Sequence, residues 1–336
     1  MTVEPLLGHG AVLARLYGAF ERQRLHHALL IEGPMGVGKR QLAERLALSV
    51  NCQNPPGPAE YCGECGACRP ILAGRHPDVI RVEPDTSRAA RSIPVEAIRE
   101  VIRQSQYHRY SARHRFVIVD PAEAMQEPAA NALLKTLEEP PDGTGFLVIT
   151  HNAKALLPTI MSRCQRVRLG TVPTDEIETW LKGRGISHAA VAARWAQGCP
   201  GRALTLAGTD PAQQIAQRDA LIAVIDGPFP DVFDFAERLT KGTRQAWAPK
   251  VERLLEIGEE LLRDTAVVAT GEPVEMVHAD LRDQLSAWAD RLWPNGVGRL
   301  ANAIQALRDD LEVFVSGKLA LAALLTAFRR ELGRPH

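Results

Sequence analysis

The chain lacks two features that mark common classes of protein: an apolar run of membrane-spanning length, and a net charge. Hydrophobic residues make up 45% of its 336 residues and charged residues 24%. This is a globular composition, which excludes a membrane-embedded or a disordered protein. The 40 basic and 40 acidic residues cancel. A protein that coats DNA by bulk phosphate neutralisation is therefore excluded, and any nucleic-acid contact must be local.

A secretion signal is also lacking. Residues 1–5 (MTVEP) do not form the basic region and apolar core of such a signal, so we expect a cytoplasmic protein without a membrane partner. In that reducing compartment, the six cysteines are expected to be metal ligands or core residues rather than disulfides.

The first strong motif is a phosphate-binding loop. Residues 33–40 read GPMGVGKR and match G-x-x-x-x-G-K-[ST] at every fixed position except the last. An apolar run at 28–32 precedes the loop and helical apolar spacing follows it, which is the strand, loop and helix that the motif requires. In the complete motif, backbone N–H groups hold phosphates, the lysine reaches the outer phosphates and a hydroxyl binds Mg²⁺. Arg40 replaces that hydroxyl. The candidate nucleotide-binding residues of the loop are Gly33, Gly36, Gly38, Lys39 and Arg40.

Two further strands are predicted to bring polar groups beside this loop. Residues 116–120 read as a buried strand ending in Asp120, where a P-loop ATPase keeps an acid that binds Mg²⁺. Pro121 stands where ATP-hydrolysing members of that class have a catalytic Glu, and Asp120 is equally suited to cap the following turn. Residues 145–150 form another strand, which presents Thr150 and Asn152 at its end. The sequence leaves open whether the loop binds ATP and Mg²⁺ or is blocked by Arg40.

Four cysteines follow the helix after the loop. They lie in a stretch rich in Gly and Pro, and two residues separate each of the last three cysteines from the next. This spacing suits one tetrahedral zinc site with the ligands Cys52, Cys62, Cys65 and Cys68. A segment with few large apolar residues needs such a source of order. Four sulfur ligands leave no open coordination position, so we expect a structural zinc rather than a catalytic one. The alternative is a set of free surface thiols.

The segment 99–115 is locally basic. Such runs are usually solvated faces, but arginines spaced around Tyr107 and Tyr110 are also able to follow a phosphate backbone. The candidate DNA-facing residues are Arg99, Arg103 and Arg109.

Several motifs together resemble one family. The loop 33–39, the four cysteines, the string 131–141 (NALLKTLEEPP) and the triplet Ser162-Arg163-Cys164 occur in this order in clamp-loader subunits of the bacterial DNA polymerase III holoenzyme, which belong to the AAA+ class. The resemblance covers about residues 5–205. It implies a hetero-pentamer with gamma/tau and delta subunits that acts on the sliding clamp and primed DNA, and a cysteine module that binds zinc. It also implies that Arg163 enters a neighbouring subunit's ATP site as an arginine finger, and that Thr150 or Asn152 lies near a nucleotide-sensing position.

The resemblance implies a fold in three parts. We expect an α/β AAA+ P-loop domain at residues 1–170, with a parallel five-stranded sheet, flanking helices and the zinc module 52–68 inserted. A small helical lid is expected at 171–210. Helical apolar spacing almost throughout residues 211–336 predicts an all-helical C-terminal domain, which by the resemblance joins a collar with other subunits.

Three departures from the ATP-hydrolysing subunits concern one site. Arg40 replaces the hydroxyl residue that binds Mg²⁺, and Pro121 replaces the catalytic Glu. Gly201 takes the place of a second sensing Arg, so that Arg202 lies one residue further on, which is a rotation of ~100° around a helix. The first hypothesis is thus a clamp-loader subunit without catalysis of its own, although part of a DNA-directed DNA polymerase, a nucleotidyltransferase. The alternative is an active AAA+ ATPase, either a motor subunit or a remodelling enzyme. A zinc-dependent DNA-binding protein outside any ring is disfavoured by the neutral charge.

Overall fold

The computed structural model describes residues 6–84, 92–312 and 316–333. The expectation drawn from residues 1–5 lies outside this range. The chain forms two compact units, Met1–Ala207 and Gly208–His336, and each is described by itself. None of the described helices is long and apolar enough to cross a membrane.

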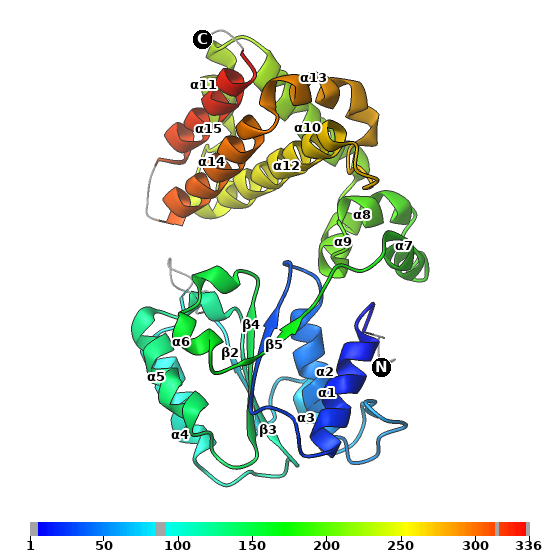
Figure 1. Ribbon diagram of the computed structural model, residues 1–336, viewed down its shortest axis with the longest axis vertical. Helices are drawn as coiled ribbons and strands as arrows, with labels where there is room; N and C mark the ends of the chain where they lie inside the picture. The colour runs from blue at the N-terminus through cyan, green and yellow to red at the C-terminus, as the bar shows by residue number, and fades with distance from the viewer. Residues whose placement is uncertain (1–5, 85–91, 313–315, 334–336) are drawn as a thin grey trace. The chain divides into compact units, whose positions relative to one another are not determined.

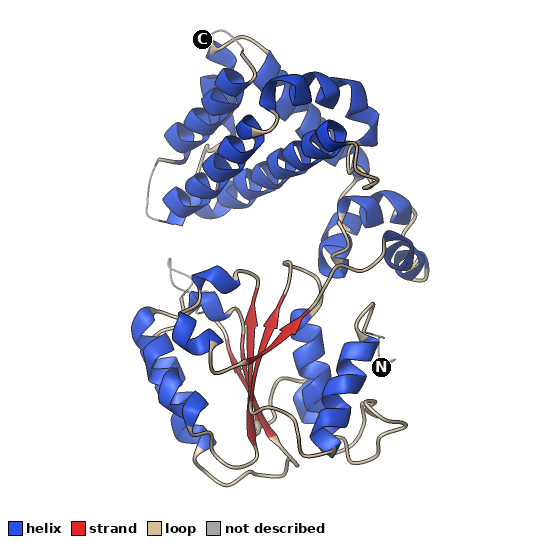
Figure 2. Cartoon of the chain, in the orientation of Figure 1, coloured by secondary structure: helices blue, strands red, loops and turns tan. Residues whose placement is uncertain are grey.

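The first unit is built on a parallel sheet (Figure 2), which has five strands, as the family resemblance implied. The strand order is β2-β3-β4-β1-β5. Every residue of the three central strands is buried. Parallel strands covered on both faces read as continuous apolar runs, which is why the sequence pattern located them. The bounds are β1 Ala28–Glu32, β2 Val79–Val82, β3 Arg115–Val119, β4 Thr144–Thr150 and β5 Gln165–Arg168.

Helices cover both faces of this sheet (Figure 1). One apolar core joins the sheet to α1 (Gly10–Glu21), α2 (Lys39–Asn51) and α3 (Cys68–Leu72). A second core joins the opposite face to α4 (Val95–Ser105), α5 (Glu127–Glu138) and α6 (Pro158–Met161), with the short turns η1 (Ala122–Ala124) and η2 (Ala153–Ala155) between them. Because the strands are parallel, their carboxyl ends lie at one edge, where such sheets bind ligands. Residues 33–38, Asp120 and His151 all follow strands at this edge.

Three short helices follow β5 in the same unit: α7 (Thr174–Lys182), α8 (Ala189–Trp195) and α9 (Pro200–Ala207). They pack around buried apolar residues such as Ile177, Leu181 and Ala203. The first unit ends with α9, at Ala207, and the prediction that residues 171–210 act as a separate lid remains a prediction.

The described part of the second unit is all helical. Its elements are α10 (Pro211–Asp226), α11 (Pro230–Leu239), α12 (Arg244–Thr270), η3 (Ala279–Leu281), α13 (Arg282–Leu292), α14 (Asn295–Glu312) and α15 (Gly317–Glu331). They share one apolar core. Arg329, only 1% exposed, donates to the carbonyl oxygen of Ile225 at 3.1 Å. This bond satisfies a carbonyl in the last turn of α10, which has no partner within its own helix.

Candidate nucleotide and metal sites

The phosphate-type loop joins β1 to α2, and its turns depend on glycine. Gly36 and Gly38 have φ angles of 77° and 110°, in the left-handed region that other residues rarely adopt. A Cβ atom at Gly36 would lie 3.0 Å from the backbone nitrogen of Arg202. The start of α9 therefore packs directly on the loop, and the amide of Gly201 donates to the carbonyl oxygen of Gly36 at 2.8 Å.

Lys39 is turned back onto its own loop. Its Nζ atom donates to the carbonyl oxygens of Gly33 at 2.7 Å and Pro34 at 2.8 Å, and the residue is 8% exposed. Burial lowers the pKa of Lys39, although the charges of Glu123 and Asp120 oppose this shift. The ammonium group is thus held in the concavity of the loop by neutral carbonyls.

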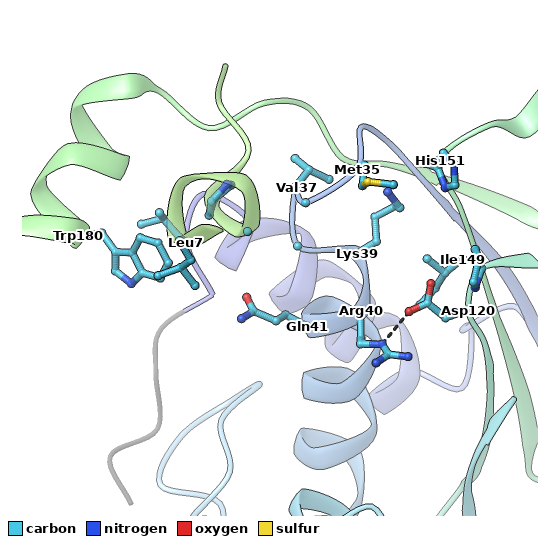
Figure 3. A pocket seen from close by; sticks show the side chains of 16 residues that line it. Leu7, Met35, Val37, Lys39, Arg40, Gln41, Asp120, Ile149, His151 and Trp180 are labelled. Carbon is cyan, nitrogen blue, oxygen red and sulfur yellow. Dashed lines mark hydrogen bonds and ion pairs between the residues drawn. The ribbon is translucent and has the colours of Figure 1, made fainter. Parts of the chain in front are cut away.

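Arg40 occupies the surroundings predicted for a metal ion. Its Nε atom donates to Oδ2 of Asp120 at 2.7 Å (Figure 3). Its Nη2 atom pairs with Oε1 of Glu83. Partial burial disfavours the charge, but the bond to Asp120 raises the pKa of Arg40. The interpretation of Asp120 as a cap is wrong: within the described residues, turn η1 has no side-chain cap bond, and the carboxylate binds Arg40.

Glu83 was missed in the sequence. It follows β2, which pairs with β3, so its carboxylate reaches the same edge as Asp120. The place of β2 beside β3 depends on the sheet order, which the sequence did not indicate.

A cavity of about 380 Å³ lies over the loop (Figure 3), within the range typical of ligand pockets. Five predicted residues line it: Gly36, Gly38, Lys39, Arg40 and Asp120. Gly33, Thr150 and Asn152 are not among the described residues of its lining. His151 lines it instead, together with a group of apolar side chains that the sequence did not single out: Leu7, Met35, Val37, Ile149, Trp180 and Leu204.

The end of β4 is organised around Glu123. Its Oε1 atom accepts bonds from the amides of His151 at 3.0 Å and Asn152 at 3.3 Å, and lies 2.5 Å from Nδ1 of His151. Burial favours the protonated form, but these bonds lower the pKa of Glu123 to about 2. Thr150 is fully buried, and its hydroxyl accepts from the amide of Asn152 at 3.0 Å. Thr150 and Asn152 thus bind one another, and the amide of Asn152 also binds Glu123.

Arg163 lies away from this cavity, after α6. Its Nε atom donates to Oε1 of Glu138, the last residue of α5, at 2.7 Å. The side chain is 33% exposed. Arg163 is thus not among the described residues that line the cavity, and its action on another subunit stays a prediction.

The four cysteines come together as one cluster. Their sulfur atoms all lie within 4.8 Å of one another, and those of Cys52 and Cys62 are 3.6 Å apart. Thiolates bound tetrahedrally at about 2.3 Å from zinc lie about 3.8 Å apart. Cys52 directly follows α2, and Cys68 begins α3. The donor set therefore fits one metal ion that joins the ends of two helices.

Backbone amides surround these sulfur atoms. Cys62 donates to the sulfur of Cys52 at 3.3 Å, and Cys65 and Cys68 each donate to the preceding cysteine of the set at 3.4 Å. Burial disfavours the thiolate of Cys65, but amides of Gln53, Cys68 and Ala67 lower its pKa to about 6. Burial raises the pKa of Cys68. The cluster thus stabilises negative sulfur at one position, as metal binding needs.

The basic segment divides into exposed and buried arginines. The three candidate DNA-facing residues, Arg99, Arg103 and Arg109, are exposed. Arg103 binds Glu100 at 2.6 Å. Arg115, by contrast, is 4% exposed and pairs with Asp78 at 2.8 Å. At least one charge of the run therefore supports the fold, and the DNA-facing role of the other three stays a prediction.

Comparisons with known proteins agree with the motifs. Residues 8–173 match the family described as "DNA polymerase III, delta subunit". The chain is 46% identical over 138 residues to DNA polymerase III subunit delta′ of Pseudomonas aeruginosa, which covers 41% of each chain. It is 37% identical over 195 residues to the delta′ subunit of Escherichia coli K12, covering 57% of this chain and 58% of that one. It is also 35% identical over 230 residues to the tau subunit of E. coli K12, covering 66% of this chain and 34% of that one.

The matched segments span about half the length of these delta′ relatives. Both delta′ and tau subunits are similar to the chain, so identity alone does not separate the two classes of subunit. The contacts of the loop and of Arg163 are therefore the observations that bear on which class it is.

Proposed function

We propose, because residues 8–173 of this chain belong to the DNA polymerase III delta-subunit family, that the protein is a clamp-loader subunit of the delta′ type. It helps to load the sliding clamp onto primed DNA within a hetero-pentamer that also contains gamma/tau and delta subunits. It does not hydrolyse ATP, and it supplies Arg163 in trans to a neighbouring motor subunit.

The ion pair between Arg40 and Asp120 carries the proposal that this subunit does not hydrolyse ATP. A P-loop enzyme needs Mg²⁺ between a loop hydroxyl and an acid at the end of a neighbouring strand. In this chain the hydroxyl is replaced, and the acid is bound by a guanidinium that stays protonated at every physiological pH. Mg²⁺ would have to displace the guanidinium of Arg40, which belongs to the chain itself, from both Asp120 and Glu83. No residue of the loop restores the missing ligand.

Arg163 supports the second part of the proposal. An arginine finger must be close to the surface of its own subunit, because it acts on phosphates held by another. Arg163 is one-third exposed and remote from the lining of its own subunit's cavity. Its guanidinium would stabilise the negative charge that develops on a transferring phosphoryl group.

The cysteine cluster is proposed to hold one structural zinc ion. Cys52, Cys62, Cys65 and Cys68 would bind it and leave no open position for a substrate. The ion would replace the apolar core that residues 52–68 cannot build. Helices 171–210 and 211–336 are proposed to act as the lid and as the collar that joins other subunits.

The alternative is an active motor ATPase or a remodelling enzyme, which the similarity to tau and the complete sequence at 33–39 favour. Isothermal titration of the purified chain with ATP and Mg²⁺ separates the candidates. No binding, or binding without turnover, supports a subunit that does not hydrolyse ATP. DNA-stimulated turnover by the chain alone would establish the alternative and overturn the proposal.

A further inference from the structure

The guanidinium of Arg163 is held by several groups at once. Its Nε and Nη2 atoms both bind Oε1 of Glu138, and its Nη1 atom donates to the carbonyl oxygen of Thr159 at 3.0 Å and to the hydroxyl of Ser162 at 3.3 Å. Four donated bonds from three nitrogens leave the planar group little freedom to rotate. The side chain is therefore oriented by the subunit to which it belongs.

Helix ends produce this arrangement. Glu138 is the last residue of α5, and Thr159 and Ser162 lie in and just after α6, which packs beside α5 (Figure 1). Carbonyl groups in the last turn of a helix have no partner within it, and this end of the helix is the negative pole of its dipole. Both effects favour a cation such as Arg163 at this corner.

The ion pair between Arg163 and Glu138 is too exposed to contribute much to the stability of the fold. The side chains of Arg163 and Glu138 are 33% and 48% exposed, and ion pairs at such sites contribute only about 0–1 kcal/mol to folding. Two nitrogens that converge on one oxygen, Oε1 of Glu138, do, however, define the direction of the guanidinium, because it is a rigid planar fork. Orientation is thus the effect that the geometry favours.

We infer that Glu138 is the positioning residue for Arg163. This inference rests on the proposed function, in which Arg163 acts on a neighbouring subunit's nucleotide. Glu138 does not touch that nucleotide; it holds the guanidinium plane, so that the arginine enters the neighbour's site already oriented. A side chain that is not oriented beforehand must be ordered during the reaction, which lowers the rate. A misplacement of about 1 Å can lower the rate about 100-fold.

The next residue provides a matched control. Glu139 is also an exposed glutamate, but it caps α5, with its amide donating to the carbonyl oxygen of Lys135. One residue turns a helical side chain by ~100°. Among the contacts of the described residues, Arg163 binds the carboxylate of Glu138. Removal of the Glu139 carboxylate therefore changes the net charge by the same amount but leaves the contact between Arg163 and Glu138 in place.

The test uses the reconstituted clamp loader with full-length chains and measures DNA-stimulated ATP hydrolysis. We expect Glu138→Ala to lower kcat about tenfold with the KM for ATP unchanged, because the nucleotide is bound by the other subunit. Glu138→Gln keeps one acceptor oxygen and should fall between Glu138→Ala and the unmodified chain. Glu139→Ala should leave kcat unchanged. In an Arg163→Ala background, Glu138→Ala should have no additional effect.

The outcomes are distinguishable. If Arg163→Ala itself has no effect, the proposed function fails. If it lowers kcat but Glu138→Ala does not, or if Glu138→Ala lowers kcat equally in both backgrounds, the positioning role alone is overturned. An increase in kcat for Glu138→Ala would also overturn it, because Glu138 would then restrain the arginine rather than orient it.

Discussion

The loop at 33–40 and the corner at Arg163 both hold cationic side chains, but these side chains bind different kinds of partner. In the loop, Lys39 binds carbonyl oxygens of its own backbone, and Arg40 binds Asp120 and Glu83. At the corner, the guanidinium of Arg163 is held by Glu138, while one-third of the side chain stays exposed. The difference is one of enclosure: Lys39 is buried against its own loop, whereas Arg163 is oriented by Glu138 and still partly exposed, as the proposed role in a neighbouring subunit would need.

The largest expected effect separates the two regions directly. Arg163→Ala should lower the ATPase kcat of the reconstituted clamp loader by about 100-fold or more, since arginine fingers contribute about 10³ to 10⁵. Lys39→Ala should change it less than about twofold, because the loop of this subunit is not a working site in the proposed function. Gel filtration of both variants checks that the complex still assembles. A large loss with Lys39→Ala and none with Arg163→Ala would reverse the comparison.

The second prediction concerns the zinc ion proposed at the cysteine cluster, where α2 ends and α3 begins. Cys68→Ser should reduce bound zinc from one ion per chain to almost none, as measured by atomic emission, and lower the free energy of unfolding by at least about 3 kcal/mol, because binding of a structural metal is coupled to folding. Cys164→Ser removes a thiol outside the cluster and should retain the zinc. A zinc-free chain of unchanged stability would show that the metal has no structural role.

The third prediction tests whether the guanidinium of Arg40 opposes the binding of Mg²⁺ and ATP. Arg40→Thr frees Asp120 and restores a hydroxyl, so isothermal titration should show Mg²⁺ and ATP binding at least about tenfold tighter, or about 1.4 kcal/mol. Arg15→Thr removes an exposed arginine of α1 and should leave the titration unchanged. Equal affinities of Arg40→Thr and the unmodified chain would mean that Arg40 does not oppose metal binding.

The smallest effect is a pH dependence at the end of β4. The pKa of Glu123 is lowered from 4.5 to about 2, so its ionised form stabilises the fold above about pH 4.5, and this contribution is lost as pH falls towards 2. Glu123→Gln should cost about 1–2 kcal/mol at pH 7 and progressively less between pH 4.5 and 3. Urea denaturation at several pH values measures the difference, with Glu96→Gln as an exposed control. A difference that does not vary with pH would contradict the role of this charge.

Much of the site was predictable because motifs specify it locally. The turns at Gly36 and Gly38 need glycine whatever surrounds them, and the cysteine spacing alone brought four thiols together. Thr150 and Asn152 were harder. Their sequence position placed them near the loop, but neither lines the cavity: the amide of Asn152 binds Glu123, and the hydroxyl of Thr150 accepts from the same amide.

By itself, the sequence determined the buried central strands, the phosphate-type loop, the missing hydroxyl at Arg40 and the cysteine cluster, because each depends on residues close together in the chain or on apolar runs. Only the tertiary structure decided what Arg40 and Arg163 bind. Glu83 is 43 residues from Arg40, and Glu138 is 25 residues from Arg163. Such long-range ion pairs form because the fold places particular strands and helix ends side by side. Local residue patterns do not predict which elements become neighbours.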